Sequence, residues 1–374
     1  MKTNKQEVLC GADVVAQEEY VFTGKCGLIT NQTGVLKDLS PTIDMLKEKC
    51  NLVALFSPEH GVRGDKQAAE DVTTFIDERT KLPVYSLYGS GLDDGEKALS
   101  TLDTVIFDIQ DVGARFYTYA YTMTDAMKIC AENKVKFIVL DRPNLLGGKT
   151  AEGTILEREF SSFVGRFPTP TRSGLTIGEF ALMMNETEKI GCDLSVVALK
   201  NWKRELYYDE TDLVFISPSP NIPTVDTAFA YIGTCIFEGT NLSEGRGTTK
   251  PFEMIGAPWL NPEKIIKQVG KQSGVILREC SFTPTFSKFK NEFCKGIQLH
   301  ITDRNCFNPF EVGIRIFKAI RDTHKEFIPN DFTVRLVGKK EILNPDLDID
   351  EFISNQKEEV VNWQNLSKKW YLYQ

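Results

Sequence analysis

Short apolar runs alternate with helical patterns along the first half of the chain. The runs have the length of buried strands and occupy residues 26–30, 51–56, 83–87, 104–109, 135–140 and 195–199. Helices are predicted in the first part of the segment 10–30, over residues 41–50 and 120–132, and from residue 175 onward. Strands and helices that alternate at this spacing predict βαβ units and a mostly parallel sheet.

Polar clusters directly follow three of these predicted strands. They occupy residues 57–64, 108–117 and 141–144. Because ligands bind at the carboxyl edge of open α/β sheets, we expect the three clusters to form one site. The first cluster brings Glu59, His60 and Arg63 close together in sequence, beside a turn that Pro58 and Gly61 permit. The alternative is a surface turn that carries these charges by chance.

A proline-rich segment separates this pattern from a second one. Ser217-Pro218-Ser219-Pro220-Asn221-Ile222-Pro223 stays extended because its prolines exclude helix. We predict an α/β domain over 10–216, a linker over 217–229 and a smaller α+β domain over 230–374. In the second domain, helices are expected near 262–271 and 309–322, strands near 274–278, 296–302 and 332–337, and a packed helical tail over 350–373.

Composition argues against several classes of function. The net charge is −8, and no basic run interleaved with aromatic residues occurs, so we expect no nucleic-acid partner. No apolar stretch reaches about 18 residues, so no membrane span is predicted. The N-terminal residues lack the apolar core of a signal peptide, but a chain whose signal had been removed would look the same.

Cofactor and metal motifs are absent from the sequence. The glycines of Leu146-Gly147-Gly148 lack the Gly-x-Gly-x-x-Gly spacing of a dinucleotide site, and there is no P-loop. The nine cysteines include no Cys-x-x-Cys pair and are interpreted as buried free thiols. With only three histidines, we expect neither a metal centre nor a cofactor.

The segment from Glu238 to Thr249 contains glycines, two carboxylates and one arginine but almost no apolar residue. Such a composition is typical of a flexible surface loop. Loops that carry Glu, Asn and Arg together are also suited to bind sugars and carboxylates. Both interpretations are compatible with the sequence.

Six motifs together resemble one known family. They are 28–34 (LITNQTG), 56–61 (FSPEHG), 108–117 (DIQDVGARFY), 140–144 (LDRPN), 219–224 (SPNIPT) and 237–249 (FEGTNLSEGRGTT). In this order they resemble the exo-β-N-acetylmuramidases of the NamZ type, from about residue 10 to the C-terminus. The sequence departs from the pattern at Leu145, where proline is expected.

The resemblance implies a Rossmann-like domain without a nucleotide, a smaller C-terminal domain and an active-site cleft between them. The implied activity is hydrolysis of a terminal, non-reducing N-acetylmuramic acid (MurNAc) from peptidoglycan fragments such as MurNAc-GlcNAc. Relatives of this type are often exported. We therefore expect a periplasmic or secreted protein if a signal was removed, and a cytoplasmic one otherwise.

Glycoside hydrolysis usually needs two carboxyl groups that flank the scissile bond. Glu59 is the first candidate, and His60 is an alternative acid/base because imidazole titrates near neutral pH. The second carboxyl group is open among five residues, which are Asp108, Asp111, Glu152, Glu238 and Glu244.

Substrate binding calls for other side chains. Bidentate arginines suit the lactyl carboxylate of MurNAc, and the candidates are Arg63, Arg115 and Arg246. Tyr117 and Asn241 are candidates for the hydroxyl and N-acetyl groups. Further candidates from the same clusters are Asp108, Gln110, Asp111, Asp141, Arg142, Glu152 and His300. Asp141 and Arg142 are equally well explained as an internal ion pair, and His300 as a strand residue.

Two other classes of function remain open. A muropeptide- or sugar-binding protein would use the same cleft without cutting. An esterase or amidase would act on the same polymer, although no Gly-x-Ser-x-Gly motif is present.

Overall fold

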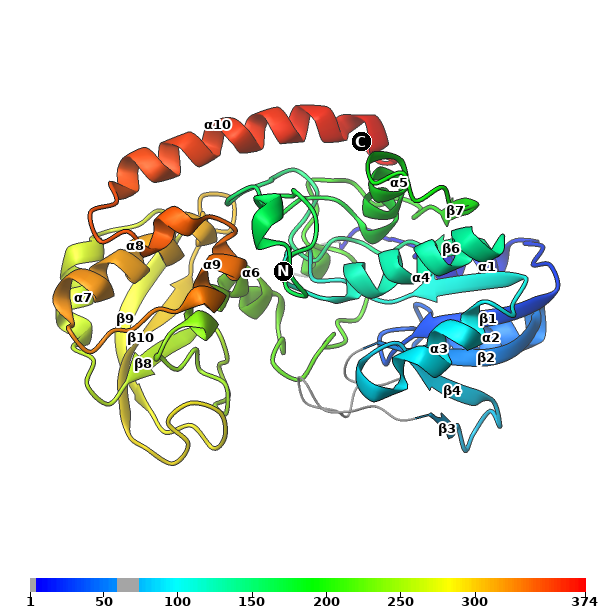
Figure 1. The fold of residues 1–374 in the computed structure, drawn as a ribbon, viewed down its shortest axis with the longest axis horizontal. Coiled ribbons are helices and arrows are strands. Elements are labelled where there is room, and N and C mark those ends of the chain that lie inside the picture. Colours follow the sequence, from blue (N-terminus) through cyan, green and yellow to red (C-terminus); the bar gives the residue numbers. More distant parts are fainter. Residues whose placement is uncertain (1–4, 59–73) are drawn as a thin grey trace.

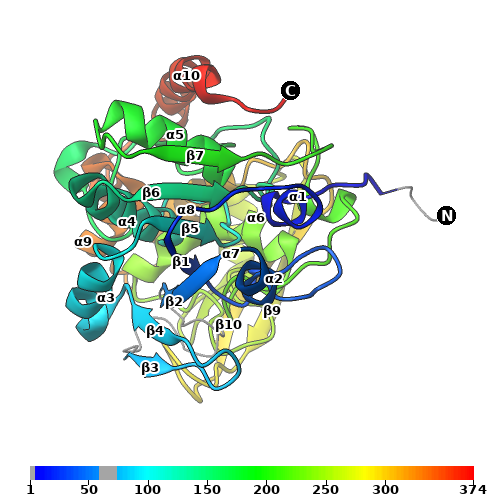
Figure 2. The same cartoon turned by 90° about the vertical axis from the view of Figure 1, so that its right-hand side faces the viewer.

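The computed structural model describes residues 5–58 and 74–374. Its first part is a seven-stranded sheet in the order β3-β4-β2-β1-β5-β6-β7 (Figures 1 and 2). The strands are β1 (Lys25–Thr30), β2 (Asn51–Ser57), β3 (Phe75–Ile76), β4 (Pro83–Ser86), β5 (Thr104–Asp108), β6 (Lys136–Leu140) and β7 (Leu194–Val197). All neighbouring strands are parallel except β3, which pairs antiparallel with β4. The predicted mostly parallel α/β domain is confirmed.

Helices cover both faces of this sheet because alternate strand residues are apolar on each side. Leu28 and Ile106 point to a core shared with α1 and α2, whereas Ile29 and Phe107 point to a core shared with α3, α4 and α5. The helices are α1 (Gly11–Gln17), α2 (Thr42–Lys49), α3 (Leu92–Leu99), α4 (Tyr119–Asn133) and α5 (Ile177–Thr187). Thr176 caps α5, since its side chain accepts the amide hydrogen of Glu179.

The strand order reverses beside β1. This strand lies between β2 and β5, and the chain builds outward from it in both directions. The carboxyl ends of β1, β2, β5 and β6 therefore lie at one edge, which is where doubly wound sheets form a crevice. The segments 108–117 and 141–144 reach this edge as predicted.

The second part is a three-stranded antiparallel sheet in the order β8-β10-β9, packed with helices. Its elements are α6 (Val225–Thr234), a 3-10 turn (Cys235–Gly239), β8 (Met254–Ala257), α7 (Pro262–Val269), β9 (Val275–Phe282), β10 (Cys294–Ile301), α8 (Pro309–Thr323) and α9 (Asp331–Val337). Helix α6 begins inside the segment predicted as a linker. The predicted strand at 332–337 is wrong, because the Asn330 side chain caps a helix there and Gly338 ends it at a φ of 80°.

The C-terminal helix α10 (Ile349–Ser367) runs along both domains (Figure 1). The residues after it bind the first domain: Tyr373 donates its hydroxyl hydrogen to Asp141 at 2.5 Å, and the Leu372 amide donates to Glu179 at 2.9 Å. The two domains are thus joined by the chain near 217–224 and again by the C-terminal residues. Within the described residues, no helix has the length and apolar character needed to cross a membrane.

Candidate active site

The crevice at the edge of the sheet is filled by the chain's own polar groups. Arg142 pairs with Asp108 through two hydrogen bonds, of 2.6 and 2.9 Å, and also donates to the Val35 carbonyl at 2.9 Å. Both charged side chains are buried. This pair links the ends of β5 and β6. The ion pair predicted between Asp141 and Arg142 is therefore corrected: Arg142 pairs with Asp108.

Asp141 and Gln110 also bond inside the first domain. Asp141 accepts from the Thr176 hydroxyl at 2.7 Å and from the Gly178 amide at 2.8 Å, which fixes the start of α5. Burial raises the pKa of Asp141 to about 6. Gln110 donates to the carbonyls of Asp111 and Pro143. These hydrogen bonds hold the edge of the sheet together, although Oε1 of Gln110 is buried without a hydrogen-bond partner.

A cavity of about 240 Å³ lies further out, where the two domains meet. We call it the interdomain cavity; its lining residues are Tyr88, Phe116, Tyr117, Thr118, Tyr119, Phe163, Val164, Ser219, Asn221, Ile222, Tyr231, Glu238, Arg246, Phe252 and Phe332. The loop before α4 supplies one wall, and the second domain supplies the opposite wall. Among these residues, Glu238 and Arg246 carry the charges.

Glu238 and Arg246 form the polar centre of the cavity. Arg246 donates from Nε and Nη2 to the same oxygen, Oε1 of Glu238, at 3.0 and 2.6 Å. Its Nε also lies 3.4 Å from Oε1 of Glu244. Lys288 donates to Oε2 of Glu244 at 3.1 Å and to the Glu238 carbonyl at 3.0 Å. Two carboxylates and two cations therefore hold one another in place.

The two carboxylates differ in access. The Glu238 side chain is 20% exposed, whereas Glu244 is only 2% exposed and lies behind Arg246 and Lys288. Burial raises the pKa of Glu238, although Arg246 opposes the rise. Its second oxygen, Oε2, lies 3.8 Å from the thiol of Cys235. Glu238 is thus a carboxyl group with a raised pKa and one oxygen outside the arginine pair, which suits proton transfer.

Aromatic rings connect the two walls of the cavity. Tyr231 packs edge-on against Phe116 at 4.9 Å and against Phe252 at 4.6 Å, and Arg246 lies 5.0 Å above the Phe252 ring. Tyr117 packs against Tyr119 at 4.8 Å. Burial raises the pKa of Tyr117 well above its usual value, so its phenol stays protonated. Rings with polar tips suit a saccharide, which has apolar ring faces and hydroxyl edges.

Arg115 does not reach the cavity, which corrects its proposed role as a carboxylate clamp. It is 5% exposed, and its Nη groups donate to the carbonyls of Thr169, Leu336 and Val337 at 2.8 to 2.9 Å and also to Thr154. Burial lowers its pKa to about 10. Arg115 therefore links the first domain to the end of α9.

Three other candidates also lie away from the cavity. Glu152 pairs with Arg172 at 2.8 Å. Asn241 bonds to the backbone of Glu326 and Ile328 at 2.7 and 2.9 Å. His300 accepts from Arg278 on the neighbouring strand at 3.1 Å. All three side chains are held by hydrogen bonds or ion pairs to other parts of the chain, away from the interdomain cavity.

Asp111 lies near the edge of the sheet, and only one of its two carboxylate oxygens accepts a hydrogen bond. Oδ2 accepts from the Gly113 amide at 2.7 Å, but Oδ1 is buried without a hydrogen-bond partner. Burial raises its pKa to about 7. This carboxyl group belongs to a small hollow beside Tyr121 and Phe180 and not to the interdomain cavity.

Glu59, His60 and Arg63 lie outside the described residues. Pro58 is the last described residue before them, and it directly follows the end of β2 at Ser57, on the carboxyl edge of the sheet. Their roles stay predictions from the sequence.

Sequence reasoning missed several residues of the cavity and its support. Tyr231, Phe252 and Lys288 come from parts of the second domain that carry no recognisable motif. Ser219 and Asn221 stand in a motif that we interpreted as a linker. Their membership of the motif 219–224 was the one indication in the sequence that these residues have a functional role, because a simple linker does not require a particular sequence.

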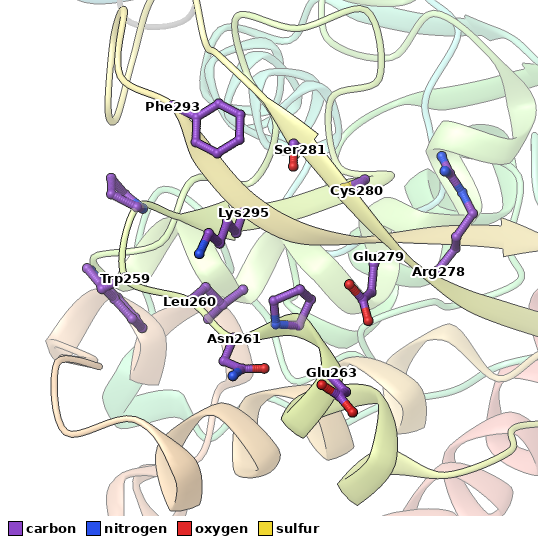
Figure 3. Close-up of a pocket in the computed structure, with 12 residues that line it drawn as sticks. Trp259, Leu260, Asn261, Glu263, Arg278, Glu279, Cys280, Ser281, Phe293 and Lys295 are labelled. Carbon is purple, nitrogen blue, oxygen red and sulfur yellow. The ribbon is translucent and has the colours of Figure 1, made fainter.

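A larger hollow, of about 710 Å³, lies on the second domain between β9, β10 and the start of α7. Figure 3 shows Trp259 and Phe293 on one side of it and Glu263 and Glu279 on the other, with Lys295 between them. No lining residue comes from the first domain or from the motif clusters. Within the described residues, no group of three or more His, Cys, Asp or Glu side chains is placed to hold a metal ion.

The doubly wound domain, the smaller antiparallel domain and the polar cavity between them define a two-domain α/β protein with a shared site. Residues 26–226 match the family described as exo-beta-N-acetylmuramidase NamZ, N-terminal, and residues 229–373 match its C-terminal counterpart. The chain belongs to the NamZ family, as its motifs predicted.

Three proteins are similar to this chain over almost its whole length. The peptidoglycan beta-N-acetylmuramidase NamZ of Bacillus subtilis (strain 168) is 45% identical over 381 residues, which cover 99% of this chain and 92% of that relative. A crystal structure of a DUF1343 family protein from Bacteroides fragilis is 37% identical and has a TM-score of 0.85, with 99% of this chain and 100% of that chain covered. A second such protein from the same organism is 31% identical with a TM-score of 0.79, and the coverage is 98% and 99%.

Proposed function

We propose that this protein is an exo-acting glycoside hydrolase that releases terminal, non-reducing MurNAc from peptidoglycan fragments. The observation that carries the proposal is the 45% identity, over nearly the whole of both chains, to a relative named as a peptidoglycan beta-N-acetylmuramidase. The interdomain cavity adds chemical support, because it combines a carboxyl group, an arginine and aromatic rings.

Glu238 is proposed as one of the two catalytic carboxyl groups. Its raised pKa and its exposed fraction of 20% support a role in proton transfer. Glu59, with His60 beside it in sequence, is proposed as the partner from the first domain. Glu244 is proposed as a positioning residue, since its buried carboxylate binds Lys288 and approaches Arg246.

Arg246 is proposed to bind the lactyl carboxylate of MurNAc. Its Nε and Nη2 are held by Glu238, which leaves Nη1 without a hydrogen bond to any described residue. An arginine fixed in this way can donate to a second carboxylate at little cost in side-chain entropy. Tyr117 forms part of the opposite wall with its hydroxyl buried, so its ring, and not its hydroxyl, is proposed to pack against the sugar.

The size of the cavity supports action at a chain end. A volume of about 240 Å³ lies below the range of about 300–1,000 Å³ that is usual for ligand pockets. A cavity of this volume suits a ligand of about one sugar unit. The saccharide substrate is thus proposed to enter with its non-reducing end first.

Chromogenic substrates test this proposal directly. A MurNAc glycoside, the matching GlcNAc glycoside and an acyl ester should be compared at equal concentration. We expect release of the chromophore from the MurNAc glycoside alone. Tight binding of MurNAc without release would favour the sugar-binding protein instead, and release from the ester would favour an esterase.

A further inference from the structure

The aromatic lining of the interdomain cavity ranges from fully buried to openly exposed. Five of its rings are at most 7% exposed, and they belong to Phe116, Tyr117, Tyr119, Tyr231 and Phe252. Phe163 lines the same cavity but is 42% exposed. Tyr88, another lining residue, is half-buried. Phe163 and Tyr88 therefore lie where the cavity opens to solvent, and we call this part the mouth of the cavity.

A short turn holds Phe163 in place at the mouth. The backbones of Ser162 and Gly165 exchange two hydrogen bonds around it, of 2.7 and 3.2 Å. The next residue, Arg166, forms an ion pair with Asp125 of α4. The turn is thus anchored to the first domain, so a ligand that packs against the Phe163 ring meets a side chain on a backbone that is already ordered.

The ring of Phe163 also packs against the ring of Tyr88. Their centroids are 5.5 Å apart, and their planes are tilted by 41°. Aromatic rings beside a polar cavity suit a pyranose, which has an apolar face. A singly exposed apolar side chain is common on protein surfaces and by itself needs no function. Phe163 differs because it lies at the mouth of the candidate active site.

The proposed function determines which part of the substrate lies at this mouth. An exo-acting hydrolase holds the terminal MurNAc inside the cavity, whose volume of about 240 Å³ suits one sugar unit. The second sugar unit is the leaving group, and it remains outside the buried part of the cavity. Its contacts with the chain are therefore made at the mouth.

We propose that Phe163, supported by Tyr88, binds the sugar on the leaving-group side of the scissile bond by packing against its apolar face. This inference rests on the proposed function and deepens it, because it assigns the subsite of the second sugar unit. Phe163 takes no part in proton transfer. It determines specificity, since it favours substrates whose leaving group is a sugar over those with a small leaving group.

Two substrates that share MurNAc but differ in the leaving group test the proposal. The disaccharide MurNAc-GlcNAc has a sugar at the proposed subsite, whereas the β-fluoride of MurNAc has only a fluorine atom there. Aryl glycosides are unsuitable, because their own ring would pack against Phe163. Initial rates of MurNAc release give kcat/KM for each substrate. The ratio of the two values does not depend on how much of a variant is folded.

Replacement of Phe163 by alanine should lower this ratio. The disaccharide should lose about 5- to 20-fold in kcat/KM, as expected when part of an aromatic ring is no longer buried against the substrate, while the value for the fluoride stays unchanged. Phe163→Tyr keeps the ring and should keep the ratio of the parent chain. The control Phe293→Ala removes a ring that is 60% exposed on the second domain, away from the interdomain cavity, and should also keep the ratio.

The outcomes separate this inference from the proposed function. If the parent chain cleaves both substrates and Phe163→Ala leaves their ratio unchanged, the subsite assignment is wrong and the proposed function stands. If the parent chain cleaves neither substrate, the proposed function is wrong, and the assignment that rests on it is wrong as well.

Discussion

Arg246 meets Glu238 through a single carboxylate oxygen, with Nε at 3.0 Å and Nη2 at 2.6 Å from Oε1. The pair lies in the wall of the interdomain cavity, and each side chain is about one fifth exposed. The arginine is therefore oriented, while one oxygen of the glutamate remains outside the pair. This arrangement separates two roles, since Arg246 can recognise a charge on the substrate and Glu238 can exchange a proton.

Replacement of Arg246 by alanine should reduce discrimination between sugars. A charged hydrogen bond contributes about 1.5–3 kcal/mol, so kcat/KM for a MurNAc glycoside should fall by roughly 10- to 150-fold. The control is Arg278→Ala, which removes an exposed arginine of β9. If Arg246→Ala lowered activity on MurNAc and GlcNAc glycosides by the same factor, the proposal that Arg246 binds the lactyl carboxylate would be wrong.

Arg115 should affect stability and not specificity. Its guanidinium satisfies the carbonyls of Thr169, Leu336 and Val337, which Arg115→Ala would leave buried without donors. We expect a loss of about 2–4 kcal/mol in the free energy of unfolding, measured in urea. The same measurement on Arg278→Ala should show almost no change. A fully stable Arg115→Ala chain with impaired sugar binding would return Arg115 to the list of substrate ligands.

Asp111 should make the stability depend on pH. Burial raises the pKa of its carboxyl group to about 7 in the folded chain, whereas an unfolded aspartate titrates near 3.9. Between about pH 4 and pH 7 the folded state thus binds more protons at this group, so its contribution to stability falls as the pH rises. Asp111→Asn should be more stable than the parent chain at pH 7.5 and should show a smaller decline from pH 5.

Urea unfolding at several pH values measures this effect. Asp93→Asn is a suitable control because Asp93 is exposed on α3. An unchanged pH slope in Asp111→Asn would mean that Asp111 is already ionised in the folded chain at pH 5.

The parallel sheet was predictable because its strands are apolar on both faces. A run such as Thr104–Asp108, with every residue buried, has few alternatives to a central strand. Residues 332–337 were predicted as a strand, but the side chain of Asn330 and the backbone of Gly338 favour a helix. The residues that cap the helix at its two ends therefore decided the structure of this short segment.

The candidate site was predictable only in part. Arg115 and Arg246 both stand in polar motifs. Arg115 is surrounded by backbone carbonyls, whereas Arg246 faces the interdomain cavity. The difference depends on Leu336 and Val337, more than 200 residues away from Arg115. The same holds for Lys288, whose role follows only from its contact with Glu244.

The central claim is that catalysis takes place in the interdomain cavity with Glu238 as a proton-transfer group, and Glu238→Gln tests it most directly. Glutamine keeps the shape and can still accept from Arg246, but it cannot exchange a proton. The rate of MurNAc glycoside hydrolysis should fall by about 10²–10⁴-fold, while the unfolding midpoint and the activity of the exposed control Glu263→Gln stay near those of the parent chain. Full activity in Glu238→Gln would contradict the account and would leave Glu59 or Glu244 to be tested in its place.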